Sequence, residues 1–202
     1  MSSQVHEPPV REELPVRDTV VDRGPDASVP GARIWGLLRL TIGWVFLWAF
    51  LDKLLALGFA TGRDPETGAI DRFGDAAWIN GANPTEGFLA NGVHTKGFLV
   101  DFYGGLAGSA IIDWIYMASM LLIGAALMLG IFTRLAALAG IVWMLLFYSA
   151  AAIWPENNPV IDDHLVYAIV LAGIAVVGAG RFLGFGRQWE KTALVSRYSI
   201  LR

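Results

Sequence analysis

Two carboxylates and a histidine stand together in the stretch NPVIDDHLVYAIV, at the start of a run that is otherwise almost wholly apolar. His164 could give or accept a proton near neutral pH, and Asp163 stands beside it. The stretch FLDKLL puts Asp52 and Lys53 inside a second apolar run, and Asp113 precedes a third. Ionisable side chains beside long apolar runs are costly unless they are paired or hydrated. These residues are therefore the candidates for a functional site.

The composition is that of a membrane protein. The 202 residues are 55% hydrophobic and only 16% charged, whereas soluble domains usually carry about 25% charged residues. The chain contains no cysteine, which excludes iron–sulfur clusters and cysteine-ligated zinc. Of the three histidines only His164 borders an apolar run, so we expect no haem held by two histidines. We expect no metal site and no nucleic-acid partner.

Four apolar runs follow a polar segment that is rich in proline. A bilayer core of about 30 Å needs about 20 helical residues. We therefore predict an all-α, polytopic membrane protein, built as an antiparallel four-helix transmembrane bundle. The alternative is a buried helical bundle in a soluble protein. The predicted helices cover residues 34–60, 114–132, 135–154 and 163–180, within a membrane domain over 31–190, with a disordered tail over 1–30 and a C-terminal tail over 191–202.

Lysine and arginine predict the orientation in the membrane. They lie before the first helix, in the turn between the second and third, and after the fourth, while the stretch 155–164 has none. Cytoplasmic segments are enriched in these residues. We predict a multi-pass protein of the prokaryotic cytoplasmic membrane with both termini in the cytoplasm. The loop over residues 61–112 then lies outside. It is too long for an ordinary connection, and its apolar residues favour a lid over disorder.

This threading predicts where the ionisable residues meet. The first helix ends, and the second and fourth begin, at the outer face, so Asp52, Lys53, Asp113, Asp163 and His164 should share one depth. We predict His164 and Asp163 as catalytic residues that handle protons, with Lys53 as an ion-pair partner and with Asp52 and Asp113 beside the ligand. The alternative is structural, because carboxylates cap helix N-termini and lysine can extend to the interface.

Aromatic residues could form a slot beside this rim. Trp44, Trp48 and Asp52 share a helix face at a spacing of four, and the third helix contributes Trp143 and Phe147. These side chains could line an apolar site for a flat, lipid-soluble ligand such as a quinone. The alternative is ordinary packing between helices.

Two long segments, LLIGAALMLGIFTRLAALAGIVWMLL and NPVIDDHLVYAIVLAGIAVVGAGRFLGFGRQWEK, resemble the DoxX/DoxD family of membrane proteins. The loop pieces WINGANPTEGFL and HTKGFL are similar to the longer DoxD branch, which includes the large membrane subunit of thiosulfate:quinone oxidoreductase. The resemblance covers about residues 34–191. It implies a four-helix membrane bundle and quinone-linked oxidation of thiosulfate to tetrathionate with a smaller partner subunit. The family-motif positions it implies are Arg134, Asp163, His164, Gly180 and Arg181.

Two functions follow as hypotheses. The first is a subunit of a quinone-linked oxidoreductase, in which a quinone enters from the lipid and takes up protons from a titratable group within about 3 Å. The second is a non-catalytic accessory or assembly subunit of a larger respiratory complex. The expected partners are the lipid bilayer, a quinone and other subunits of a membrane complex. A small-solute transporter is a third possibility, although no inverted repeat is evident.

Overall fold

The computed structural model describes residues 31–93, 99–152, 155 and 158–201. Within these ranges the chain is helical and forms no strand, and its β-structure is a single isolated bridge between Arg63 and Ile70. The all-α prediction is confirmed for this part of the chain. The predicted tail over residues 1–30 and the predicted end of the third helix at residue 154 lie outside the described residues.

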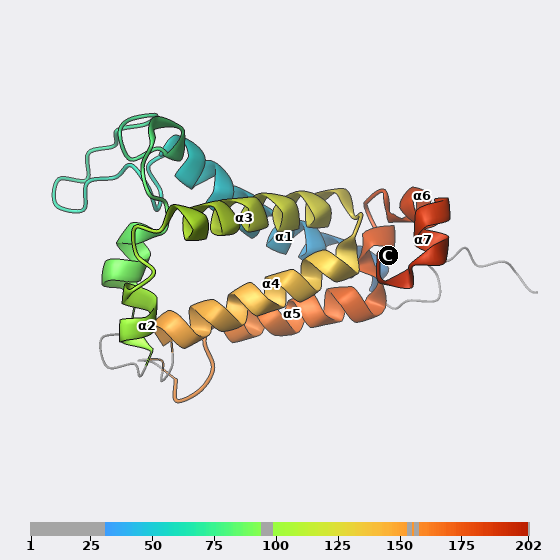
Figure 1. The fold of residues 1–202 in the computed structure, drawn as a ribbon. Coiled ribbons are helices and arrows are strands. Elements are labelled where there is room, and N and C mark those ends of the chain that lie inside the picture. The colour runs from blue at the N-terminus through green and yellow to red at the C-terminus, as the bar shows by residue number, and fades with distance from the viewer. Residues whose placement is uncertain (1–30, 94–98, 153–154, 156–157, 202) are drawn as a thin grey trace, which may run out of the picture.

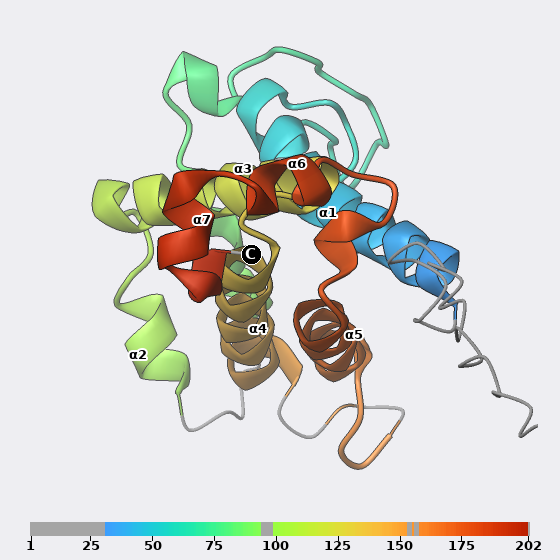
Figure 2. The same cartoon turned by 90° about the vertical axis from the view of Figure 1, so that its right-hand side faces the viewer.

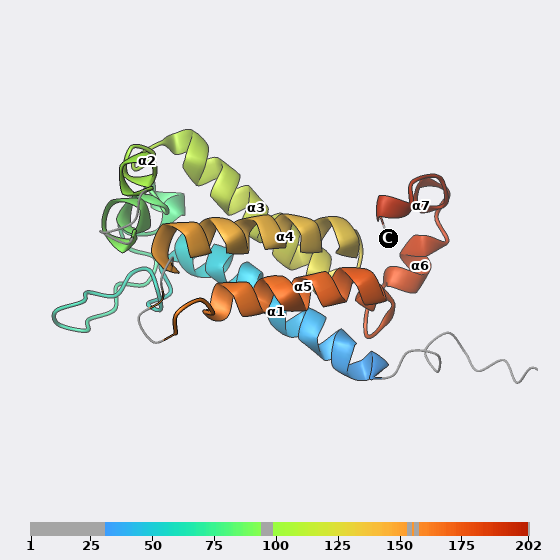
Figure 3. The same ribbon diagram turned by 90° about the horizontal axis from the view of Figure 1, so that it is seen from below.

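Three helices are long and apolar enough to cross a membrane, which indicates a membrane protein. A fourth apolar helix, α5 (Asp163–Val177), has 15 residues. Two of these helices, α1 (Ala32–Leu55) and α3 (Ala110–Leu129), form one layer, and the other two form the second (Figures 1 and 3). Consecutive long helices alternate in direction (Figure 1). The long helices are α1 (Ala32–Leu55), α3 (Ala110–Leu129), α4 (Thr133–Phe147), which continues as the π-helical turn η3 (Tyr148–Ala152), and α5 (Asp163–Val177).

Short helices occupy the two ends of the molecule. The connection between α1 and α3 contains η1 (Trp78–Asn80), η2 (Phe88–Gly92) and α2 (Val100–Gly104). After α5 come η4 (Ala179–Arg181), α6 (Gly186–Glu190), α7 (Ala193–Arg197) and η5 (Ser199–Leu201). The helices α6 and α7 lie at the end of the molecule where α3 stops and α4 starts (Figure 2). The predicted C-terminal tail is therefore folded, with Val195 buried.

The core lies between the two layers, and the outer faces are apolar as well. Phe46, Met117 and Leu171 of α1, α3 and α5 are buried together. A Cβ atom at Gly124 would lie 2.6 Å from the backbone nitrogen of Leu47, so α1 and α3 approach as closely as they do because this residue is glycine. Large apolar side chains on the opposite faces are exposed, as expected where lipid surrounds the helices.

Helix ends differ from the prediction at several places: α3 covers Ala110–Leu129 rather than 114–132, and α1 and α4 each begin two residues early. The first helix ends at Leu55 rather than at residue 60, because Ala56 adopts a left-handed conformation with a φ of 50°. Its N–H bonds to the carbonyl oxygen of Asp52 and closes the last turn. Likewise α5 ends at Val177 rather than at residue 180, because Gly178 adopts a φ of 67°. These are the left-handed closures that commonly end helices.

A buried arginine joins the layers at the end of the molecule that carries α6. The guanidinium of Arg39 is fully buried and donates to the carbonyl oxygens of four residues from two other segments. The acceptors are Leu127, Met128 at 3.1 Å, Phe182 at 3.0 Å and Leu183 at 2.9 Å. The last carbonyls of a helix have no N–H donors from a following turn, and Arg39 supplies hydrogen bonds to such carbonyls at the end of α3.

Candidate functional site

A cavity of about 400 Å³ lies where the connection between α1 and α3 packs on the helices. Among the described residues that line it, Lys53 is the one charged side chain, and most of the others are apolar or aromatic. Its volume is within the range of about 300–1,000 Å³ that is usual for small-molecule sites. The aromatic rings on its wall belong to Phe88, Phe102, Tyr103, Tyr116, Trp143 and Phe147.

The roof of the cavity comes from the connecting segment. Leu89, Val93 and Tyr103 pack against Ala150 of η3 in a small apolar cluster. The hydroxyl group of Tyr103 also lies 2.5 Å from Oγ of Ser149, which fixes α2 to the end of α4. The described part of the connection thus covers the ends of α3 and α4.

The cavity reaches the molecular surface through apolar side chains. Phe102 and Ile115 both line it, and they are 59% and 52% exposed. Ile115 belongs to α3, one of the helices of membrane length. An apolar rim on such a helix is an entrance that a lipid-soluble molecule can use without crossing water.

Lys53 stands near the end of α1 and borders the cavity. Its Nζ lies 5.9 Å from the centroid of the Tyr116 ring, within the distance of a cation–π interaction. The expected ion pair with Asp113 or Asp163 is not formed, and in the described part of the chain no carboxylate lies within ion-pair distance of this amine. The amine is therefore available to a ligand in the cavity.

The buried carboxylate of Asp52 holds the start of the connecting segment. It is 2% exposed and accepts hydrogen bonds from the N–H groups of Phe59, Ala60 and Thr61, at 3.2, 2.8 and 2.9 Å. Three amide donors satisfy most of its capacity as an acceptor. Asp52 does not line the cavity, and its role is structural, near the C-terminus of α1 rather than at a helix N-terminus, where the sequence analysis expected carboxylates to act as caps.

Asp113 fixes a residue of the cavity wall. It is 2% exposed, and its Oδ1 accepts from the backbone nitrogen of Thr85 at 3.0 Å and from the Thr85 hydroxyl at 2.7 Å. Thr85 lines the cavity and Asp113 does not. Asp113 therefore acts on the site through the position of Thr85.

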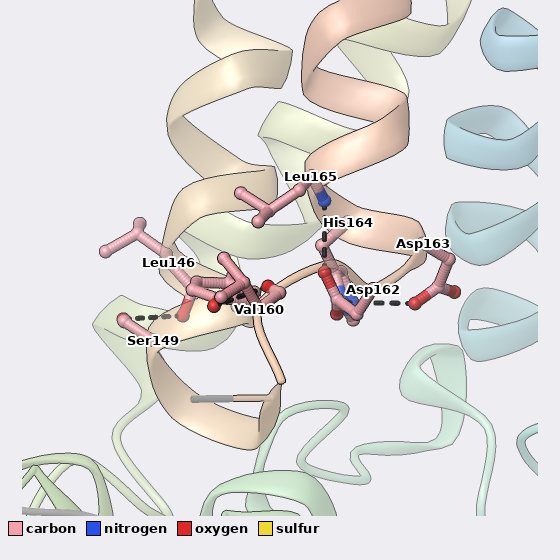
Figure 4. Close-up of polar contacts among 8 residues, drawn as sticks. Leu146, Ser149, Val160, Asp162, Asp163, His164 and Leu165 are labelled. Atoms are coloured by element: carbon pink, nitrogen blue, oxygen red, sulfur yellow. Dashed lines mark hydrogen bonds and ion pairs between the residues drawn. The ribbon is translucent and has the colours of Figure 1, made fainter. Parts of the chain in front are cut away.

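A histidine and two carboxylates meet at the start of α5 (Figure 4). Asp162 precedes the helix and accepts from the N–H of Leu165 at 3.1 Å, while its other oxygen lies 2.5 Å from Nδ1 of His164. Asp163 is 3.4 Å from the same nitrogen, and its side chain is 69% exposed. Burial alone would raise the pKa of Asp162, but hydrogen bonds with His164 and Leu165 hold that pKa below its ordinary value. The main partner of the imidazole is thus Asp162, a residue that the sequence analysis did not include among the site residues.

His164 lies beside the cavity but not on its wall. Its ring centroid is 5.7 Å from that of Phe147, and Phe147 lines the cavity. The Phe147 ring therefore touches both the imidazole and the cavity. Lys53, not His164, is the charged side chain that lines the cavity.

Comparisons of this chain with protein-family models, with curated proteins and with solved structures found no match.

The predicted aromatic slot divides into two groups. Trp143 and Phe147 line the cavity, with 5.5 Å between their ring centroids. Trp44 and Trp48 do not line it. They lie against each other at 5.6 Å, and Trp48 packs on Phe59 at 5.0 Å. The two tryptophans thus pack α1 against residues 59–61, the segment whose amides bond to Asp52.

The remaining aromatic residues of the wall were missed as ligand contacts. Phe88, Phe102 and Tyr103 come from the connection, whose aromatic pieces the sequence analysis interpreted only as a lid. Tyr116 of α3 lies one helical turn after Asp113, and that spacing is the signal that could have found it.

Two of the positions that the DoxX/DoxD resemblance singles out, Gly180 and Arg181, lie at the opposite end of the molecule. A Cβ at Gly180 would lie 2.3 Å from Oγ1 of Thr133, so a side chain does not fit there. Arg181 donates through Nε to Glu190 at 2.8 Å. Both positions serve packing around the end of α5 and do not contribute to the cavity.

Proposed function

We propose that the chain is an integral membrane subunit of a quinone-linked oxidoreductase, similar to the DoxX/DoxD proteins, and that the quinone binds in the cavity beside Lys53. The observation that carries this proposal is an aromatic cavity with a single amine, opening at the surface of a helix of membrane length. A quinone ring is flat and apolar and carries two carbonyl oxygens. It can stack on Trp143 and Phe147 and accept a hydrogen bond from Lys53.

The quinone would leave the site as quinol after taking up two electrons and two protons. In this proposal His164, held by Asp162, exchanges protons with the outer solution, and Asp163 is the exposed group beside it. The amine of Lys53 is the donor next to the ring. Following the family resemblance, the electrons come from two thiosulfate ions joined as tetrathionate, through a smaller partner subunit.

Binding is tested with the purified chain in lipid nanodiscs, by quenching of tryptophan fluorescence with a short-chain ubiquinone. Ala150 is buried on the cavity wall, and Ala150→Phe should fill part of the cavity and weaken binding about tenfold or more. Ala139→Phe, in a groove elsewhere on α3 and α4, is the matched control and should leave the affinity unchanged. Circular dichroism verifies the fold of both variants. Equal affinities in both variants would contradict the proposed site.

Turnover is tested on the complex as it is purified from its membrane, with thiosulfate as donor and the same quinone as acceptor. His164→Ala and Asp162→Asn should both slow quinone reduction, because the imidazole loses its function or its orientation. Asp163→Asn should have the smaller effect, because this carboxylate is exposed and farther from Nδ1. Unchanged turnover in His164→Ala would remove the proposed proton route.

The proposed topology is a four-helix antiparallel bundle in the cytoplasmic membrane, with both termini inside. The alternating helix directions support it (Figure 1). Because the chain has no cysteine, single cysteines can report sidedness directly. A membrane-impermeant maleimide should label Glu66→Cys in intact cells, and should label Ser196→Cys only after permeabilisation. Both positions are exposed. Labelling of both in intact cells would put the connecting segment and the C-terminal helices on one side and refute the topology.

A non-catalytic accessory subunit of a larger respiratory complex is the second candidate. The observation that favours it is an apolar groove of about 510 Å³ between α3 and α4, lined in part by small side chains such as Ala125 and Ala139. Small residues allow a transmembrane helix of another subunit to approach closely. Mass spectrometry of the gently solubilised complex separates the two candidates. Ala139→Phe should then release the partner while quinone binding persists.

A further inference from the structure

The charge of Lys53 has no opposite charge beside it on the cavity wall. Asp52, the preceding residue, attracts this charge from outside the cavity, but its oxygens accept their hydrogen bonds from the amides of Phe59, Ala60 and Thr61 and form no ion pair with the amine. Asp113 on α3 directs its oxygen to Thr85. Among the described residues these are the two buried carboxylates, and neither lines the cavity.

The other groups near the amine offer little compensation. The Tyr116 ring provides a cation–π contact at 5.9 Å, and the Tyr103 hydroxyl is engaged with Ser149 at 2.5 Å. An ammonium group on an apolar wall is costly unless a partner of opposite charge reaches it. A bound ligand is the partner that this arrangement leaves room for.

We propose that the cavity selects a lipid-soluble anion, an apolar body with one negatively charged oxygen next to Lys53, and that its ligand is a quinone-type ring with an acidic hydroxyl group in the deprotonated form. The inference rests on the proposed function of the cavity and adds the charge state of the ligand. An ionised oxygen accepts a shorter and stronger hydrogen bond from an ammonium group than a neutral carbonyl does. The aromatic wall selects for a flat ring, and Lys53 selects for its charge.

The experiment compares two matched ligands with the full chain in nanodiscs near neutral pH. One is a hydroxynaphthoquinone with a short alkyl chain, whose hydroxyl group is ionised at this pH. The other has the same ring and alkyl chain but carries a methyl group in place of the hydroxyl group. The hydroxynaphthoquinone should bind about tenfold more tightly. Lys53→Met should abolish this preference while changing the affinity of the neutral analogue less than about twofold. Lys53→Arg should keep the preference, and Lys191→Met, at an exposed lysine, should leave both affinities unchanged.

The outcomes separate this inference from the function on which it rests. Equal affinity of the two ligands for the unmodified chain, or an equal loss of both in Lys53→Met, overturns the charge selection and leaves quinone binding standing. Failure of both ligands to bind overturns the proposed function and the inference together. A third arm uses palmitate as a competitor. Displacement that depends on Lys53 and is as strong as that by the hydroxynaphthoquinone supports anion recognition but overturns the ring as the ligand.

Discussion

Replacing Arg39 by methionine removes the hydrogen bonds by which this side chain joins α1 to the end of α3 and to the segment after α5. The guanidinium bonds to four backbone carbonyls, on Leu127, Met128, Phe182 and Leu183. Hydrogen bonds between membrane helices average about 0.6 kcal/mol and reach about 1.7 kcal/mol, so four of them contribute about 2–7 kcal/mol. Burial of the charge offsets part of this, and Nε of Arg39 has no partner in the described part of the chain. We expect Arg39→Met to lower the free energy of unfolding by about 3 kcal/mol.

The assay is unfolding in mixed micelles with increasing amounts of sodium dodecyl sulfate, followed by tryptophan fluorescence. Arg33→Met is the matched control, because Arg33 lies on the same helix and is exposed. This change should alter the free energy of unfolding by less than about 0.5 kcal/mol. If Arg39→Met and Arg33→Met unfold at the same detergent composition, the four carbonyls do not depend on the guanidinium and the reasoning is refuted.

Three further predictions concern the carboxylates. Asp52→Asn weakens the hold on the connecting segment, so limited proteolysis should cleave that segment several-fold faster than in the control Asp75→Asn, an exposed position on the same segment. Thr85→Val removes the hydroxyl bond to Asp113 and should cost about 1–2 kcal/mol in the same unfolding assay. Because the pKa of Asp162 is lowered in the folded protein, the stability it contributes is present above about pH 3.9 and is lost as pH falls through the lower folded value. Unfolding measured against pH should therefore show an acid limb that is shallower in Asp162→Asn.

Hydropathy predicted the three long helices because a bilayer sets a minimum length for any apolar helix. It could not predict where they end. The run after Asp52 stays apolar beyond Leu55, so composition gives no reason for a stop. The stop arises because Ala56 adopts a left-handed conformation and the Asp52 carboxylate binds the amides that follow. That choice depends on tertiary contacts, which the periodicity of a single run does not contain.

The sequence predicted the part of the site that lies on the long helices, but not the part that the connecting segment contributes. Topology alone brought Lys53 near Trp143 and Phe147, since all three stand toward the same end of the helices. The rest of the wall comes from the connecting segment, whose residues have no period that assigns them to a face. The partner of His164 was also misjudged. Asp162 and Asp163 are adjacent and identical in chemistry, and only the extended backbone of the residue before the helix turns Asp162 towards the imidazole.

The contrast between Asp52 and Lys53 follows from the groups that the end of a helix leaves unpaired. The last turn of α1 presents carbonyl oxygens, which an amine could bind. The connecting segment supplies other donors here. The amide of Phe73 bonds to the carbonyl of Leu55, the last residue of α1, and Nε of Arg72 and Nε of Arg63 bond to the carbonyls of Leu57 and Gly58 just beyond it. Because these donors satisfy the carbonyls, the one amine near the end of α1 is not drawn into the backbone. The segment whose amides bind the Asp52 carboxylate away from the cavity is therefore also the segment whose donors bond to the nearby carbonyls, and the Lys53 amine lines the cavity.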